Sequence, residues 1–294
     1  MSELIQLLES SPLLAITFLL IIGLLIGSFL NVVIYRLPLM IENELAEQCQ
    51  LLTDSSVTQA TDLEAEEKSF NLARPNSHCP HCKVPVKAWQ NIPVISYLLL
   101  KGRCQACKTP ISLQYPLTEI TAALLAVISW LLFGFSPQGI ALFTVSLVLL
   151  ALSIIDFKTF LLPDRLTLPL LWAGLLYQTL YQPGELSAAI WGAALGYLTL
   201  WLIYWLFKLV TGKEGMGYGD FKLLAALGAW LGATMLPALM LMSALSGLII
   251  GLLYKALNRD HQGGVPFGPA LALSGWFCLA FPDTVRSIMA QLFL

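Results

Sequence analysis

Charged side chains are scarce in this chain of 294 residues. Asp, Glu, Lys and Arg make up 12% of the sequence, hydrophobic residues make up 57%, and the mean hydropathy is +0.75. Soluble domains carry about a quarter charged residues. The scarcity of charge excludes a water-soluble globular protein and predicts a membrane protein. The formal net charge of −2 gives no reason to expect a nucleic-acid partner.

Several other features are absent. No basic residue precedes the first apolar run and no small-residue cleavage site follows it. We therefore interpret this segment as a retained anchor and not as a signal peptide. No glycine-rich loop stands between a strand and a helix, so no nucleotide-binding cradle is recognisable. No internal repeat of clear period is present.

Long apolar runs dominate the rest of the sequence. A helix needs about 20 mostly apolar residues to cross a bilayer. We predict eight spans, roughly at 13–34, 117–134, 138–156, 165–181, 187–207, 220–233, 235–254 and 265–282. The uncharged run from Lys222 to Tyr254 could be one tilted helix or two short ones, and neither Gly232 nor Pro237 settles this, because membrane helices tolerate both residue types.

The basic residues decide between these alternatives. With eight spans, every Lys and Arg except Arg286 falls on one side, whereas a single span through 223–254 would place Lys255 and Arg259 on the other. Cytoplasmic loops carry the excess of Lys and Arg. We therefore predict two spans in this run, a cytoplasmic location for the basic loops, and periplasmic termini.

The predicted fold is an all-α polytopic membrane protein with about eight transmembrane helices and a cytoplasmic zinc-binding module inserted after the first. We divide it into a first transmembrane helix (1–38), the module (39–115) and a transmembrane core (116–294). Residues 39–70 are acidic and polar, and Asp54–Thr61 is expected to be a linker because it cannot bury enough apolar area to offset the cost of ordering.

Four of the six cysteines form two Cys-x-x-Cys pairs, Cys79–Cys82 and Cys104–Cys107. Two such pairs are typical of a tetrahedral zinc site, because each turn directs two thiolates at one point. Lys83 and Lys108 stand where glycine is common in such turns. Two disulfides are the alternative, but thiols stay reduced in the predicted cytoplasmic location. A closed four-thiolate site would be structural and would hold the loop Trp89–Gly102 in place.

Two aspartates lie at the ends of predicted spans. Asp156 ends the third span and Asp220 begins the sixth, after a glycine-rich run that includes Gly217 and Gly219. An ionisable residue near lipid is costly and indicates a functional site. Both acids would lie near the cytoplasmic boundary. Two adjacent carboxylates cannot both ionise, so they would share one proton.

A shared proton is the requirement of an aspartic protease. The ionised carboxylate activates a water molecule and the protonated one polarises the peptide carbonyl. Because Gly217 and Gly219 lack side chains, an extended peptide could approach the backbone at Asp220 closely.

Each acid must also be compared with a structural explanation. Asp220 and Asp164 both precede helices and could serve as N-caps, and Arg165 stands beside Asp164. Asp156 has no such explanation, because a negative charge at a helix C-terminus opposes the helix dipole. We therefore rank Asp156 above Asp164 as the partner of Asp220.

Taken together, these motifs resemble those of the bacterial type IV prepilin peptidases, the leader peptidase/N-methyltransferases of pilus and type II secretion systems. The resemblance extends from about Gly27 to Gly268. It rests on five blocks in the family's order: Gly27–Pro38, the two cysteine pairs with Asn91–Tyr97 and Gly102–Cys104 between them, Tyr115–Glu119, Ile155–Asp164, and Gly215–Lys222.

The resemblance implies a bifunctional intramembrane aspartic protease of the Gly-x-Gly-Asp type in the bacterial inner membrane. It would remove the short basic leader from prepilins or pseudopilins at the cytoplasmic face and then methylate the new N-terminal residue with S-adenosylmethionine. It assigns catalysis to Asp156 and Asp220, with Asp164 in the same motif, and a zinc tetrad to Cys79, Cys82, Cys104 and Cys107. It assigns neither the S-adenosylmethionine site nor an oligomeric state.

Two other classes of function remain open on the residues alone. In a secondary transporter, Asp156 and Asp220 would bind a proton or cation where glycines break a helix. Transport sites lie near the membrane midplane, however, whereas these acids are predicted near one face. In a non-enzymatic assembly scaffold, the metal module would be a docking surface and Asp→Asn changes would be tolerated.

Overall fold

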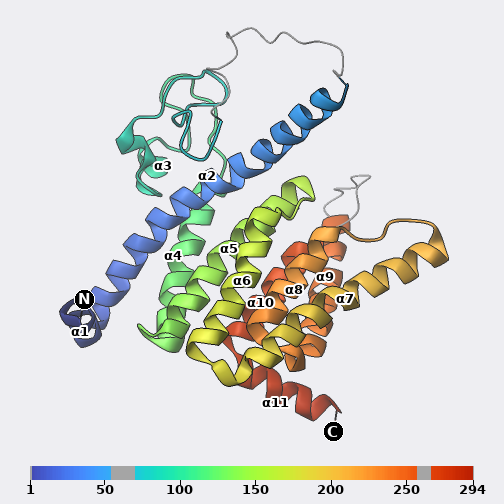
Figure 1. The fold of residues 1–294 in the computed structure, drawn as a ribbon. Coiled ribbons are helices and arrows are strands. Elements are labelled where there is room, and N and C mark those ends of the chain that lie inside the picture. The colour runs from blue at the N-terminus through green and yellow to red at the C-terminus, as the bar shows by residue number, and fades with distance from the viewer. Residues whose placement is uncertain (1, 54–69, 257–265, 294) are drawn as a thin grey trace. The chain divides into compact units, whose positions relative to one another are not determined.

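The computed structural model describes residues 2–53, 70–256 and 266–293, which fold almost entirely into helices (Figure 1). In these residues no β-strand forms, and extended pairing is confined to two isolated bridges, His78 with Pro85 and Arg103 with Pro110. The predicted all-α class is confirmed. Contacts divide the chain into two compact units, one up to Val127 and one from Ile128 onward. The predicted linker Asp54–Thr61 lies outside the described residues.

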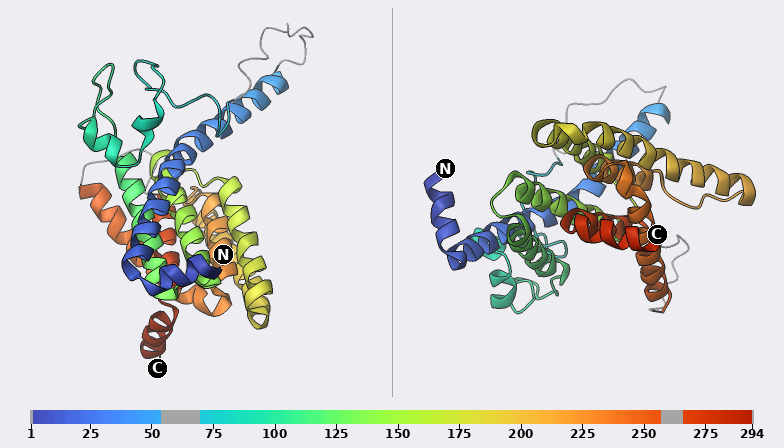
Figure 2. Two further views of the ribbon diagram at one scale, coloured as in Figure 1. Left: turned by 90° about the vertical axis from the view of Figure 1, so that its left-hand side faces the viewer. Right: turned by 90° about the horizontal axis from the view of Figure 1, so that it is seen from below.

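The first unit is built on a long helix. The short helix α1 (Ser2–Ser10) precedes α2 (Pro12–Thr53), and Figure 2 shows the chain bending between them. Helix α2 has 42 residues and contains Pro38. It therefore continues well beyond the predicted end of the first span near residue 34.

Helix α2 packs closely on α4 (Gln114–Phe133). A Cβ atom on Gly27 would lie 2.7 Å from the Cα atom of Glu119, so only glycine allows this approach. One turn further on, the Nδ2 atom of Asn31 donates a hydrogen bond of 3.1 Å to the carbonyl oxygen of Tyr115. This is the helix–helix contact expected of a polar residue inside a membrane span.

The segment after residue 69 is fastened to α2 by Arg36. Arg36 is 7% exposed, and its guanidinium donates to the carbonyl oxygens of Asn71 at 2.8 Å and Pro75 at 2.6 Å. It also lies over the ring of Phe70, 5.8 Å from the centroid. The segment continues through the short helices η1 (Ala88–Asn91) and α3 (Ile95–Leu99).

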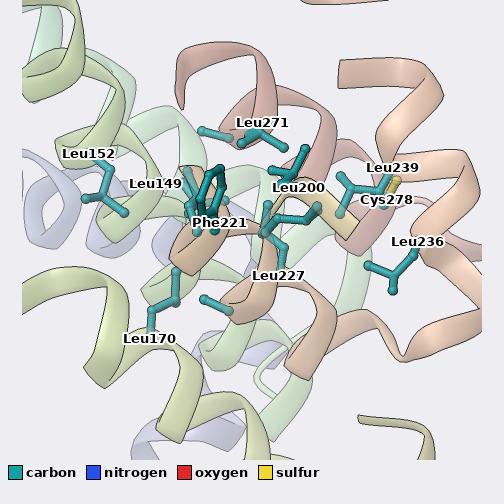
Figure 3. Close-up of a cluster of buried hydrophobic side chains, with 14 of the residues drawn as sticks. Leu149, Leu152, Leu170, Leu200, Phe221, Leu227, Leu236, Leu239, Leu271 and Cys278 are labelled. Carbon is teal, nitrogen blue, oxygen red and sulfur yellow. The ribbon is translucent and has the colours of Figure 1, made fainter. Parts of the chain in front are cut away.

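The second unit is a helical bundle around α8. Its elements are α5 (Pro137–Thr159), α6 (Asp164–Tyr181), η2 (Pro183–Glu185), α7 (Leu186–Thr211), α8 (Tyr218–Leu231), η3 (Ala233–Met235), α9 (Leu236–Ala256), α10 (Gly268–Ala280) and α11 (Pro282–Phe293). Helix α8 contacts α6, α7 and α10. Its side chains Phe221, Leu224 and Leu227 are fully buried and belong to one hydrophobic cluster. Figure 3 shows Phe221 and Leu227 beside Leu200 of α7 and Leu271 of α10.

Each of the eight predicted spans coincides with a helix, but eight membrane crossings are not confirmed. Five described helical segments are long and apolar enough to cross a membrane: Pro12–Gln50, Gln114–Phe133, Pro137–Thr159, Pro183–Thr211 and Ala233–Leu253. Helices α8 and α10 have only 14 and 13 residues. At about 1.5 Å per residue, such helices are shorter than the roughly 30 Å hydrocarbon core.

The run after Lys222 forms two helices. Helix α8 ends at Leu231, its C-cap Gly232 has a positive φ of 78°, and α9 begins at Leu236. The prediction that this run is divided in two is confirmed at the level of helices. Glycine adopts a positive φ without steric cost, which suits Gly232 to the end of α8.

Candidate active site and metal centre

Asp156 lies in the last turn of α5 and is 5% exposed. Its Oδ2 atom accepts a hydrogen bond of 3.0 Å from the backbone N–H of Gly268, the first residue of α10. The first N–H groups of a helix have no partner inside the helix, and the N-terminal end of its dipole is positive. The field of α5, which opposes a negative charge here, is therefore offset by the N-terminus of α10.

Gly268 is a site residue that sequence reasoning did not identify. A Cβ atom at this position would lie 2.6 Å from the Oδ2 atom of Asp156 and 3.1 Å from the Cδ2 atom of Leu162. Only glycine therefore allows the backbone to reach the carboxylate. The following Pro269 is a signal for a helix start, but it carries no information about which acid the helix meets.

Asp220 is the third residue of α8 and is 7% exposed. The N-cap position is occupied by Gly217, and the N–H of Asp220 donates to its carbonyl oxygen at 3.2 Å. The N-cap explanation for Asp220 is therefore wrong. The charges of Asp220 and Asp156 act on each other. Both acids lie at one end of the second unit, where α5 ends and α8 and α10 begin, and we call them the acid pair.

The two glycines beside Asp220 differ in their surroundings. A Cβ atom on Gly219 would lie 2.6 Å from the Cβ atom of Leu162, so this glycine is required for packing. A Cβ atom on Gly217 would meet only the Oδ2 atom of Asp220, at 3.8 Å. Gly217 therefore leaves open space on the side of the carboxylate, and Gly219 does not.

Asp164, unlike the acid pair, forms an ion pair with a lysine. It is the first residue of α6, and both of its carboxylate oxygens accept hydrogen bonds of 2.7 Å from the Nζ atom of Lys222. The side chain of Asp164 is 52% exposed. By contrast, the described residues include no basic side chain in an ion pair with Asp156 or Asp220. Asp164 is thus a neutralised surface acid.

The four cysteines of the two Cys-x-x-Cys pairs form one cluster, which we call the cysteine cluster. Their Sγ atoms all lie within 4.8 Å of one another, and the structure contains no disulfide among them. The two turns are equivalent: Lys83 and Lys108 have φ values of 60° and 61°. Lysine therefore adopts the left-handed conformation for which glycine is common. Four convergent thiols can hold one metal ion.

Local hydrogen bonds favour the thiolate form of two cysteines in this cluster, Cys79 and Cys107. The Sγ atom of Cys107 lies 3.2 Å from the hydroxyl of Thr109. This side chain and the backbone of Thr109 lower the pKa of Cys107 to about 6. Backbone N–H groups of Cys82 and His81 lower the pKa of Cys79. Because metals bind thiolates and not thiols, these donors prepare Cys79 and Cys107 to bind a metal.

Comparison with known proteins covers nearly the whole chain. The Bacterial Peptidase A24 N-terminal domain matches residues 21–133, and the Type IV leader peptidase family matches residues 142–252. No solved structure matches.

Curated relatives extend over both units. The prepilin leader peptidase/N-methyltransferases of Stutzerimonas stutzeri and Pseudomonas aeruginosa are each 46% identical and cover 98% of both chains. The enzyme of the same name from Neisseria gonorrhoeae is 44% identical over 90% of both chains. These matches give the transporter interpretation no support. The chain belongs to the type IV leader peptidase family, among the prepilin leader peptidase/N-methyltransferases.

Proposed function

We propose that this protein removes the leader peptide from type IV prepilins or pseudopilins with Asp156 and Asp220 as its catalytic acids, and then N-methylates the new N-terminus. The observation that carries the proposal is the acid pair itself. Two carboxylates from different helices are buried, interact electrostatically and have no ion-paired base among the described residues. Isolated buried charges of like sign are costly, so a catalytic use is the best reason for keeping them together.

The pair can perform peptide hydrolysis with one shared proton. The ionised carboxylate takes a proton from the attacking water, and the protonated carboxyl donates to the carbonyl oxygen of the scissile bond. The two acids exchange roles when the amine leaves. The N–H of Gly268 holds the Oδ2 atom of Asp156 through this cycle, and the open space beside Gly217 admits the peptide backbone.

The site would face the cytoplasm in the inner membrane. The distribution of Lys and Arg supports this orientation, since basic residues are concentrated in cytoplasmic loops. Asp156 at the end of α5 and Asp220 at the start of α8 would then both meet a leader that is still in the cytoplasm, and both termini would be periplasmic.

The cysteine cluster fits a structural zinc ion. In a tetrahedral site with Zn–S distances of about 2.3 Å, the sulfur atoms are about 3.8 Å apart. The Sγ atoms of Cys79 and Cys107 are separated by 3.8 Å. Cys79, Cys82, Cys104 and Cys107 would fill all four coordination positions, so the ion would stabilise the segment around α3 and take no part in the reaction.

Methylation requires a methyl donor, for which S-adenosylmethionine is the candidate. A sulfonium donor supplies an activated methyl group to an amine. The N-methyltransferase names of the relatives support this half of the proposal.

Co-expression with a prepilin tests the catalytic assignment. Asp156→Asn and Asp220→Asn should each abolish leader removal, while Asp164→Asn, the matched control at the third acid, should retain it. Leader removal is measured by the mass of the pilin N-terminus, and the amount of each variant in the membrane is measured in parallel. Cleavage by the Asp156→Asn variant at the wild-type rate would refute the assignment, and cleavage by both variants would favour a non-enzymatic scaffold.

A further inference from the structure

A second buried polar cluster lies in the first unit, between α2 and α4, and peptide hydrolysis does not use it. Its two principal members are Asn31 of α2 and Glu119 of α4, which are 4% and 7% exposed. In the part of the chain that the structure describes, no basic side chain forms an ion pair with Glu119. The burial of a carboxyl and an amide between these two helices therefore needs an explanation.

The amide oxygen of Asn31 has no hydrogen-bond partner. The Oδ1 atom is buried and unsatisfied, while Nδ2 donates to the carbonyl oxygen of Tyr115. If the amide of Asn31 were flipped, Oδ1 would face the carbonyl oxygen of Tyr115, and two acceptors would repel each other. The carbonyl of Tyr115 therefore determines the orientation of the amide. A buried acceptor without a donor is costly. It indicates a donor supplied by a ligand.

Glu119 is held by a strained backbone. Its Oε2 atom accepts a hydrogen bond of 2.8 Å from the N–H of Val94. Val94 has a φ of 58° and a ψ of −47°. A positive φ is an outlier for a β-branched residue, and such strain is concentrated at functional sites. A ligand N–H that replaced Val94 on the carboxylate would allow this backbone to relax.

The spacing of the two acceptors selects the ligand. Gly27 packs against Glu119, and Asn31, four residues further along α2, bonds to Tyr115, four residues earlier in α4. Asn31 and Glu119 therefore lie on adjacent turns of the contact between α2 and α4. A charged nitrogen donates at about 2.8 Å. One nitrogen between them can reach both if it carries at least two hydrogens, and a positive charge on it would match the carboxylate. A primary ammonium group has these properties.

We propose that Glu119 and Asn31 bind the α-ammonium group of the cleaved pilin and that Glu119 is the base for its N-methylation. This inference rests on the proposed function and names the residues of its methyl-transfer half. Glu119 takes one proton from the ammonium, and the neutral amine stays hydrogen-bonded to the Oδ1 atom of Asn31. A nitrogen–carbon bond forms with the methyl group of the sulfonium donor as its sulfur–carbon bond breaks.

The electrons of the broken bond remain on sulfur, which leaves as a neutral thioether, and the nitrogen becomes a methylammonium. The proton on Glu119 then passes to solvent. Asn31 orients the nitrogen lone pair, because its Oδ1 atom accepts a hydrogen bond from one of the two remaining N–H groups.

The test uses the purified full chain in lipid nanodiscs and two activities. Leader removal is measured on a prepilin, and methylation is measured with labelled S-adenosylmethionine on a peptide of the mature pilin N-terminus. Asn31→Leu and Glu119→Gln should lower methylation about 10- to 100-fold, as expected for losing a hydrogen bond to a charged group, and should change cleavage less than about twofold. Thr118→Val is the matched control, since the hydroxyl of Thr118 bonds within its own helix.

A binding measurement without methyl donor gives a second readout. The wild-type protein should bind the free-amine peptide about 10- to 100-fold more tightly than its N-acetylated form. This preference should disappear in Asn31→Leu and Glu119→Gln and persist in Thr118→Val.

Two results would overturn this inference while leaving the proposed function intact: wild-type methylation by both variants, or equal binding of the two peptides by the wild-type protein. Joint loss of cleavage and methylation in both variants would also overturn it, because it would indicate a general structural role. A wild-type protein that neither cleaves nor methylates would instead refute the proposed function itself.

Discussion

The backbone N–H of Gly268 donates a hydrogen bond of 3.0 Å to the Oδ2 atom of Asp156. The two residues are 112 positions apart in the sequence, and no side chain of Gly268 takes part. The bond brings the N-terminus of α10 to a carboxylate that its own helix, α5, disfavours. It gives this acid a fixed orientation beside Asp220.

Gly268→Ala should reduce leader removal by about 100-fold, because its Cβ atom would meet the Oδ2 atom of Asp156 at 2.6 Å and a displacement of about 1 Å can cost this much. Gly184→Ala is the control, since nothing lies within 4 Å of a Cβ atom there. Cleavage rates on a purified prepilin are compared at equal enzyme concentration. Full activity of Gly268→Ala would show that the Gly268 contact is dispensable.

The ion pair between Asp164 and Lys222 should contribute little to stability. Its side chains are 52% and 31% exposed, and exposed pairs contribute about 0–1 kcal/mol. Asp164→Asn and Lys222→Met should each lower the free energy of unfolding by no more than about 1 kcal/mol. A double-mutant cycle in detergent measures the coupling. A coupling well above this range would mean that the pair is more deeply desolvated than its exposure indicates.

Cys79→Ser should remove most of the bound metal from the purified protein, because a site with three thiolates no longer closes the tetrahedron. Elemental analysis should find about one zinc per wild-type chain. Cys49→Ser, outside the cysteine cluster, should leave the metal content unchanged. Equal zinc in the two variants, or none in the wild type, would contradict a zinc site at this cluster.

Arg36→Ala should release the segment that follows residue 69 from α2. The guanidinium donates to the carbonyl oxygens of Asn71, Leu72 and Pro75, and hydrogen bonds to a charged group are worth about 1.5–3 kcal/mol. Amide hydrogen exchange around residues 71–76 should therefore accelerate at least about 10-fold. Arg74→Ala, an exposed arginine in the same segment, is the control. Unchanged exchange in Arg36→Ala would mean that other contacts hold the segment.

The helices could be predicted from the apolar runs, because in a membrane each backbone group must be satisfied within its own segment. The lengths of the helices were less predictable than their positions. Helix α2 continues through Pro38 to Thr53, since polar residues beyond the apolar run still form helix there. The division of the run after Lys222 was predicted from the basic residues, but it could not be assigned to Gly232, because membrane helices also contain glycine without a break.

The candidate site divides in the same way. The side chains of Asp156, Asp220 and the four cysteines were identifiable, because a carboxylate near lipid and paired Cys-x-x-Cys turns are unusual in sequence. The residues that interact with these side chains could not be identified from the sequence. Arg165 stands next to Asp164 in the chain, yet the ion pair forms with Lys222 of α8. Glu119 lies in the second turn of α4 and accepts a hydrogen bond from the N–H of Val94, 25 residues earlier in the chain.

The sequence by itself determined that this is an all-helical membrane protein with two unusual acids and a four-thiol cluster, because those properties depend on residue type and local spacing. Only the tertiary structure decided that the N–H of Gly268 meets Asp156, that Lys222 neutralises Asp164, and that the Oδ1 atom of Asn31 is left without a donor. Every non-proline residue carries the same backbone N–H. Which backbone N–H reaches a given acid depends on how the helices pack, and patterns of single residues do not predict that packing.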